Sequence, residues 1–327
     1  MPLNWLYLYI AITDYMRRLK DYLLLYLKGI GMGAADMVPG VSGGTVAFIT
    51  GIYEELIDSI SAINLEAFHL LKQGKLAEFW KHINGTFLVV LLLGIVTSLL
   101  SLAKILTYLL ENQPIPLWSF FFGLIIISAV LVLKEIKVWK PRVVIAGIIG
   151  IAIAYTITII SPAKTPDELW FVFICGAIAI CAMILPGISG AFILLLLVKY
   201  EYIVSAVTNY DIPVIAVFAA GCITGLLSFA RVVSWLLDKF YNTAVALLAG
   251  FMIGSLNKVW PWKVVTEFYL NRHGEQKPLT YRSVLPTEYA AETGLDADIL
   301  YAVLFAMVGV LLVVILEKIS HRRVSPN

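Results

Sequence analysis

The chain has 327 residues, of which 60% are hydrophobic and only 14% are charged, whereas soluble domains carry about 25% charged residues. Together with a mean hydropathy of +0.89, this composition excludes a soluble globular protein and indicates an all-α polytopic membrane protein. The formal net charge of +2 excludes the strongly basic surface that binds nucleic acid, so we expect the membrane bilayer and no nucleic acid as a partner.

The first 21 residues combine an apolar stretch with a cluster of positive charges. The apolar stretch runs from Leu3 to Ile12, and Arg17, Arg18 and Lys20 follow it. A secretory signal peptide has the opposite order, with its positive charges first. We therefore expect residues 1–21 to form an interfacial helix on the membrane surface.

Residues 22–60 form an apolar segment that is interrupted at its centre. The interruption reads Pro39-Gly40-Val41-Ser42-Gly43-Gly44, and proline and glycine at such a place break a helix. A full crossing needs about 17 residues or more, and the arms 22–38 and 45–60 are at or below that length. The pattern therefore favours a re-entrant hairpin over two crossings.

Three uninterrupted apolar segments complete the first half of the chain. They follow a polar stretch at residues 61–84, and the length of each lies within the range of about 17 to 25 residues that crosses a bilayer. Their bounds are Thr86–Leu110, Leu117–Leu133 and Arg142–Ile160. Residues 22–160 are therefore predicted to comprise one re-entrant hairpin and three transmembrane helices.

The second half, residues 161–327, repeats this order. Pro186-Gly187-Ile188-Ser189-Gly190-Ala191 lies 147 positions after the first motif, inside the apolar segment 169–207. An external loop is expected at 258–298. The three predicted transmembrane helices are Pro213–Leu237, Thr243–Val259 and Ile299–Glu317. Gly94–Lys104 also aligns without gaps with Gly221–Arg231, so the chain is interpreted as two homologous halves.

The distribution of positive charge predicts the topology. Lysine and arginine crowd the N-terminus, residues 61–84, residues 134–142 and the C-terminus, so both termini are expected to be cytoplasmic. Each half has three full crossings, an odd number, and the second half is therefore inverted. The two hairpins then enter from opposite sides and meet near mid-membrane, an architecture typical of secondary transporters.

The tips of the hairpins carry the predicted substrate site. A helix that begins just after Ser42 or Ser189 would direct free amides and the positive end of its dipole at the tip, where phosphate binds. The predicted phosphate-binding residues are Pro39, Gly40, Ser42, Gly43, Gly44 and Thr45 in the first motif and Pro186, Gly187, Ser189 and Gly190 in the second. The alternative is that the glycines only allow two hairpins to pack tightly.

Two cations occupy equivalent positions in the two halves. Lys104 and Arg231 end the matched stretches described above and are expected to point toward opposite faces of the membrane. Each is predicted to offer the phosphate a partner on its own side. The alternative is that both side chains extend to the lipid headgroups.

Three carboxylates are candidates for ion coupling. Asp36 lies just before the first break, where its counterpart in the second half is Met183. A carboxylate at membrane depth is protonatable or paired, so Asp36 is the first candidate for coupling to H+ or Na+, and Glu54 and Glu201 rank after it. The alternative role of Asp36 is to pair with Lys28 or to cap amides at the break.

The tips also match the Gly-x-Ser-Gly pattern of intramembrane serine proteases. A catalytic serine needs a base, usually histidine, and all four histidines lie outside the apolar segments. We therefore expect that the protein is not an enzyme. The three cysteines lack metal-ligand spacing, so neither a metal site nor a cofactor is expected.

Several stretches resemble one known family. Ala34–Thr45, Gly51-Ile52-Tyr53-Glu54 and Leu185–Gly190 look like the motifs of the bacterial polyprenyl-phosphate transporter family, PopT, and the resemblance covers nearly the whole chain. It implies a flippase that carries undecaprenyl phosphate from the outer to the inner leaflet of the bacterial cytoplasmic membrane, so that the lipid carrier of cell-wall synthesis is recycled. It does not imply a coupling ion.

A transporter or channel for a small soluble anion is the alternative function. The two functions differ in access, since a lipid needs a cavity that opens between helices toward the bilayer, whereas a soluble ion needs an aqueous path. A homo-oligomer is compatible with either function.

Overall fold

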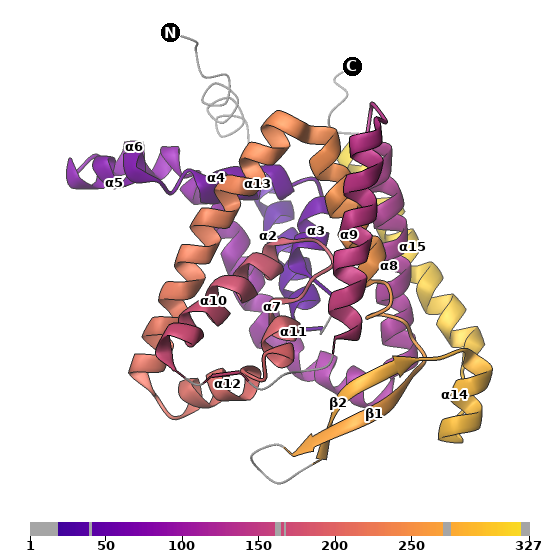
Figure 1. Ribbon diagram of the computed structural model, residues 1–327. Helices are drawn as coiled ribbons and strands as arrows, with labels where there is room; N and C mark the ends of the chain where they lie inside the picture. The colour runs from indigo at the N-terminus through magenta and orange to yellow at the C-terminus, as the bar shows by residue number, and fades with distance from the viewer. Residues whose placement is uncertain (1–18, 39–40, 161–164, 167, 271–275, 322–327) are drawn as a thin grey trace.

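The computed structural model describes residues 19–38, 41–160, 165–166, 168–270 and 276–321. This part of the chain forms a bundle of helices with one β-hairpin at the bottom of Figure 1. Five of the described helices are long and apolar enough to cross a membrane, which agrees with the predicted polytopic membrane protein. Most of the predicted interfacial helix, and the predicted site residues Pro39 and Gly40, lie outside the described residues.

The first motif segment folds into α2 (Leu19–Asp36), α3 (Gly43–Ile49) and α4 (Tyr53–Ser61). The predicted arm 45–60 is therefore two helices, because Gly51 takes a left-handed conformation (φ 69°) that ends α3. In Figure 1, α2 descends from the top of the molecule and α4 lies across the top.

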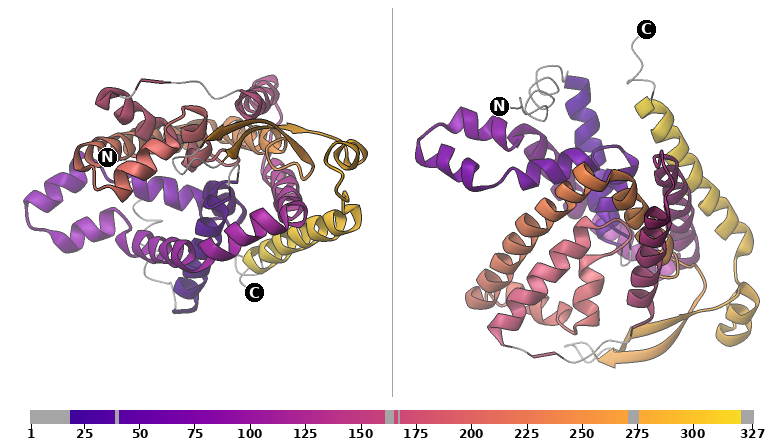
Figure 2. Two further views of the ribbon diagram at one scale, coloured as in Figure 1. Left: turned by 90° about the horizontal axis from the view of Figure 1, so that it is seen from below. Right: turned by 45° about the horizontal axis from the view of Figure 1, so that its top comes forward.

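The polar stretch 61–84 is also helical. It forms α5 (Leu65–Lys72) and α6 (Leu76–His82), which project from one side of the bundle (Figure 2). The side chain of Asn64 starts α5, since its Oδ1 accepts hydrogen bonds from the first free amides of that helix.

Three long helices follow, as predicted for the first half. They are α7 (Gly85–Asn112), α8 (Pro114–Lys134) and α9 (Pro141–Ile159). Proline stands at the first position of α8 and of α9, where its missing N–H costs nothing. Only Gln113 (φ −137°, ψ 52°) separates α7 from α8.

The second motif segment repeats the arrangement of the first. It folds into α10 (Leu169–Ile184), α11 (Gly190–Leu196) and α12 (Tyr200–Thr208), and α11 and α12 meet at 108°. Val198, which lies 147 positions after Gly51, also takes a left-handed conformation (φ 53°). Figure 1 shows α10 rising toward the centre and α12 lying across the bottom.

Helix α13 (Ile212–Ser255) contains the predicted span 213–237 and most of the predicted span 243–259. The expected loop between them is absent, because a single non-helical residue, Phe240 (φ −136°, ψ 45°), forms the bend. This is nearly the conformation of Gln113, 127 positions earlier. The two arms of α13 therefore match α7 and α8.

The last span is α15 (Ile299–His321), as predicted. The external loop before it contains the antiparallel strands β1 (Lys263–Leu270) and β2 (Gln276–Ser283) and the short helix α14 (Pro286–Thr293). The prediction of an all-α fold is wrong for this hairpin. The valine and aromatic residues of β1 favour a strand.

The helices pack in equivalent pairs in the two halves. Helix α2 packs along α7 and α10 along the first arm of α13, while α8 packs along α15 and α9 along the second arm of α13. The first two pairs touch through glycines at matching positions. A Cβ on Gly94 would lie 2.3 Å from the carbonyl oxygen of Tyr26, and one on Gly221 would lie 2.1 Å from that of Phe173. Such contacts bring the backbones close together.

Candidate functional site

The two motif segments lie in direct contact inside the largest apolar core cluster. Ser42 Oγ donates a hydrogen bond to the carbonyl oxygen of Met183 at 2.9 Å. Thr45 Oγ1 accepts one from the amide of Gly187, also at 2.9 Å. Val41 and Ile188 at the two tips are both buried in this core. Two hydroxyls of the first motif thus connect it to the second.

Both motif serines start a helix, as their position predicts. Ser42 has an extended backbone, and its Oγ accepts a hydrogen bond from the amide of Gly44 at 3.0 Å. Ser189 is extended as well, and its Oγ accepts from the amide of Phe192 at 3.4 Å. A serine at this place satisfies one of the free amides of the first turn.

Asp36 contributes a second cap to the first tip. Its Oδ1 accepts a hydrogen bond from the amide of Gly43 at 2.7 Å, which places a carboxylate at the positive end of α3. The sequence suggested two structural roles for Asp36, pairing with Lys28 or capping amides at the break. The hydrogen bond from Gly43 is of the capping kind. Its role in ion coupling stays a prediction.

The glycines of the motifs are needed for the close packing of the tips. A Cβ on Gly44 would lie 2.4 Å from the carbonyl oxygen of Ile184, and one on Gly190 would lie 2.4 Å from that of Ala179. Gly187 has a positive φ of 86°. These contacts support the packing role of the motif glycines, while their role in binding phosphate stays a prediction.

The tip hydroxyls are hidden from both surfaces. Ser42 and Thr45 have no exposed area and Ser189 is 4% exposed. The caps and the contacts between the tips already use several of the groups that the predicted phosphate site would offer, among them Ser42 Oγ and the amides of Gly43 and Gly187. A phosphate can therefore reach these groups only if the tips move apart.

The predicted cationic partners lie away from the tips. Lys104 on α7 and Arg231 on α13 are both exposed. Arg231 Nη2 donates a hydrogen bond to the carbonyl oxygen of Ile63 at 2.9 Å and so connects α13 to the segment between α4 and α5. The structure brings neither cation to the buried hydroxyls.

Glu54, at the start of α4, lines a cavity of about 240 Å³ together with Glu135, just after α8, and Glu317 of α15. Burial raises the pKa of Glu54, and the carboxylates of Asp58 and Glu135 raise it further. Glu201 lies at the start of α12, in the matching place of the second half, and is partly buried. Both carboxylates lie on the short helices that follow the tips, α4 and α12.

Sequence reasoning named Lys28 only as a possible partner of Asp36 and did not predict that a lysine lies at the end of each short tip helix. Lys28 Nζ donates to the carbonyl oxygen of Thr50, which ends α3, at 2.6 Å. Lys199, only 1% exposed, donates to the carbonyl oxygen of Thr165 at 3.1 Å just after α11. A cation there offsets the negative end of the helix dipole. The two lysines come from non-equivalent positions, so the repeat does not reveal them.

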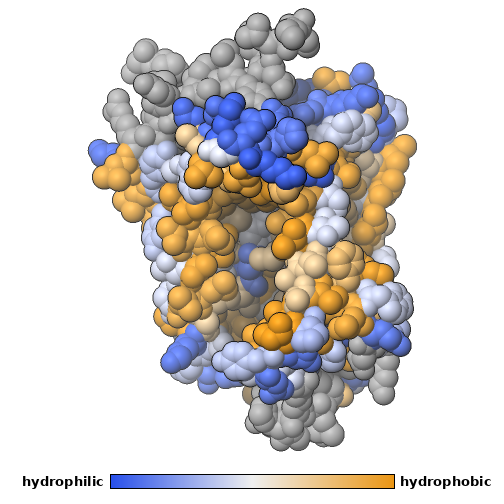
Figure 3. Space-filling view, turned by 90° about the vertical axis from the view of Figure 1, so that its left-hand side faces the viewer, coloured by the Kyte–Doolittle hydropathy of each residue, from blue (hydrophilic) through white to orange (hydrophobic). Residues whose placement is uncertain are grey.

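One face of the molecule is hollowed at mid-height. Figure 3 shows hydrophobic side chains on both sides of this hollow and hydrophilic side chains in its depth. The same face carries α5, α6 and the first arm of α13 in Figure 1. A hollow that opens sideways between apolar walls is the kind of access that a lipid requires.

Comparisons with known proteins agree on one group. A family model described as undecaprenyl phosphate translocase-like matches residues 32–277. The chain is 45% identical over 302 residues to a polyprenyl-phosphate transporter of Vibrio cholerae serotype O1, which covers 92% of this chain and 98% of the relative. It is 34% identical over 254 residues to a polyprenyl-phosphate transporter of Staphylococcus aureus, which covers 72% of this chain and 85% of the relative. No solved structure matches significantly.

Proposed function

The chain belongs to the undecaprenyl phosphate translocase-like family, and we propose that it carries undecaprenyl phosphate from the outer to the inner leaflet of the bacterial cytoplasmic membrane. It is a multi-pass membrane protein that transports polyprenyl phosphate, and the inward direction, which recycles the lipid carrier, is part of the proposal. The observation that carries the proposal is the sideways hollow with apolar walls and a hydrophilic depth.

A polyprenyl phosphate combines a charged head with a long apolar tail. The head is costly to move through hydrocarbon, and the tail is not. The hollow would shield the head while the tail stays among the lipid tails. An exclusively aqueous path for a soluble anion would have no need of apolar walls.

We propose that the two halves are inverted repeats and that the head passes between their tips. The equivalent helix pairs and the matching bends at Gln113 and Phe240 support the repeat. The first hairpin enters from the cytoplasmic side and the second from outside. When the tips separate, the hydroxyl of Ser42 and the amide of Gly187 lose their partners in the other tip. These groups, and Ser189 at the start of α11, then become available to the phosphate.

Coupling to H+ or Na+ would provide a driving force. An anion that moves inward works against the usual inside-negative potential, at a cost of about 2.3 kcal/mol per charge and 100 mV. Asp36 is the proposed coupling group, because its carboxylate caps the amide of Gly43 at the first tip, where the head would pass. A cation bound to it would offset part of the negative charge of the head.

A flipping assay tests the proposal. Wild-type protein in liposomes should accelerate the movement of undecaprenyl phosphate between leaflets, and the double variant Ser42→Ala, Ser189→Ala should be at least tenfold slower. Ser119→Ala is the matched control, since Ser119 is buried and its Oγ donates within α8. Equal rates for the wild type and the double variant would contradict the role of the tips. Flux of inorganic phosphate without lipid movement would favour the soluble-anion function.

A further inference from the structure

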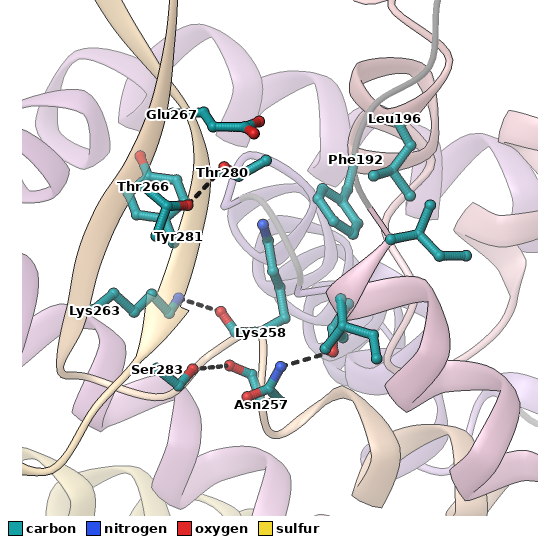
Figure 4. Close-up of a pocket in the computed structure, with 13 residues that line it drawn as sticks. Phe192, Leu196, Asn257, Lys258, Lys263, Thr266, Glu267, Thr280, Tyr281 and Ser283 are labelled. Atoms are coloured by element: carbon teal, nitrogen blue, oxygen red, sulfur yellow. Dashed lines mark hydrogen bonds between the residues drawn. The ribbon is translucent and has the colours of Figure 1, made fainter.

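A second polar cavity, of about 190 Å³, lies between the helices and the β-hairpin (Figure 4). The end of α9, helix α11, the segment after α13 and both strands contribute its walls. The cavity is therefore on the side of the molecule where the second motif segment enters, which the proposed topology places outside the cell.

Two lysines line this cavity. Figure 4 shows the side chain of Lys258 extending into the space toward Phe192. Its Nζ lies 3.8 Å from the centre of the Phe192 ring and 5.7 Å from that of Tyr281. Among the described residues, no hydrogen-bond acceptor is recorded for this ammonium group. Lys263 Nζ donates to the carbonyl oxygen of Lys258 and lies 3.9 Å from the ring centre of Trp118.

Two lysines and one carboxylate are the ionisable aliphatic side chains among the residues that line this cavity. Burial lowers the pKa of Lys258, which lies beyond the end of α13 at Ser255, to about 8. Burial and the nearby Lys258 also lower the pKa of Lys263 well below its usual value. Glu267 is the carboxylate among the lining residues. Burial and mutual repulsion make it costly to charge both half-buried lysines at once, and a bound anion would favour their charged forms.

The hydroxyl groups around the lysines suit an oxyanion. Thr280, on β2, and Thr266, on β1, share a hydrogen bond at 2.7 Å, and Ser283 donates to the carbonyl oxygen of Asn257. All four residues line the cavity, as Figure 4 shows. Ammonium and hydroxyl donors around one space are the groups that hold a phosphate.

The acidic cavity of Glu54, Glu135 and Glu317 is the counterpart of this basic cavity in the other half. Leu131 lines the acidic cavity and Lys258 the basic one, 127 positions apart, which is the offset between Gln113 and Phe240. The equivalent Thr158 and Glu317 are 159 positions apart, as are Gly150 and Gly309, which make matching helix contacts. Corresponding places in the two halves thus carry opposite charge.

We propose that Lys258 and Lys263 form a capture site for the phosphate monoester group of the substrate on the outer side, before the head reaches the tips. The inference rests on the proposed function and topology. The matching inner cavity, with its three glutamates, repels the head. The head is therefore retained on the outer side only. The site would recognise the phosphate group, which is common to the lipid head and to free phosphate.

Binding to the purified protein tests the site. Farnesyl phosphate, farnesol and inorganic phosphate serve as three probes. Lys258→Gln should weaken farnesyl phosphate binding at least tenfold, and Lys258→Arg should retain most of it. Lys239→Gln is the matched control, because Lys239 is exposed and lies over Trp235 beside the bend of α13, away from the cavity. Competition by inorganic phosphate at similar concentrations would identify free phosphate as the ligand, which would overturn lipid capture. Binding by Lys258→Gln equal to that of the wild type would overturn the site.

A transport measurement separates this inference from the proposed function. In liposomes, Lys258→Gln should raise the lipid concentration for half-maximal flipping and leave the maximal rate close to that of the wild type. If the wild type does not flip the lipid, the proposed function fails. If the wild type and Lys258→Gln flip it equally at every concentration, the capture site fails and the function stands.

Discussion

A substitution that replaces one oxygen of Asp36 can separate its structural role from its proposed role in transport. Asp36→Asn keeps a side-chain oxygen for the amide of Gly43, so thermal unfolding in detergent should stay close to that of the wild type. The amide cannot bind and release a proton, so the dependence of flipping on an ion gradient should be lost. Asp36→Ala should lose the cap as well, at a cost of about 0.5–2 kcal/mol. Ion-dependent flipping by Asp36→Asn would rule out Asp36 as the coupling group.

Gly44 tests the close contact between the tips. In Gly44→Ala, the new Cβ would meet the carbonyl oxygen of Ile184 at 2.4 Å, and backbone atoms cannot yield without moving one tip. We expect a loss of about 1–3 kcal/mol and a flipping rate reduced at least tenfold. The control is Gly31→Ala in α2, whose Cβ would lie 3.4 Å from Val46 Cγ1, an ordinary contact. Thermal unfolding and flipping measure both variants, and equal behaviour would contradict tight tip packing.

At the level of helices, the two short helices α5 and α12 report the topology. Gln73, just after α5, and Asn209, just after α12, are both exposed. In a cysteine-free background, Asn209→Cys in right-side-out membranes should react with a membrane-impermeant maleimide. Gln73→Cys should react only after permeabilisation. Labelling of both positions from the same side would exclude opposite entry of the two hairpins.

The sequence predicts the long helices well because membrane spans need only length and apolarity. It also predicts that serines start α3 and α11, since the Pro-Gly break leaves a capping residue directly before each helix. The breaks at Gly51 and Val198 were missed because each depends on one residue with positive φ. The contact between Thr45 and Gly187 joins residues 142 positions apart, and local patterns carry no information on such pairs. The sequence did carry a signal for the basic cavity. Lys258 and Lys263 lie at the start of the predicted external loop, and the other predicted external loops have few cations.

At the scale of the whole molecule, the sideways hollow determines what the protein must recognise. If the tail stays in the bilayer, the protein contacts mainly the head, and the length of the tail matters little. Flipping rates of farnesyl phosphate and undecaprenyl phosphate in liposomes should therefore agree within about threefold. The flipping rate of farnesol should be the same with and without the protein. A steep dependence on tail length would mean that the tail passes through the protein.

The bends at Gln113 and Phe240 have a mechanical consequence. Each joins two long helices through a single non-helical residue, so there is no slack chain to absorb a movement of one arm. The first arm of α13 packs on α10, which carries the second tip, and its second arm leads to Lys258. We therefore expect a tilt of α10 to move the second arm of α13 through the bend at Phe240, and with it the outer basic cavity. In each half, one bent pair of helices thus connects the tip to a charged cavity.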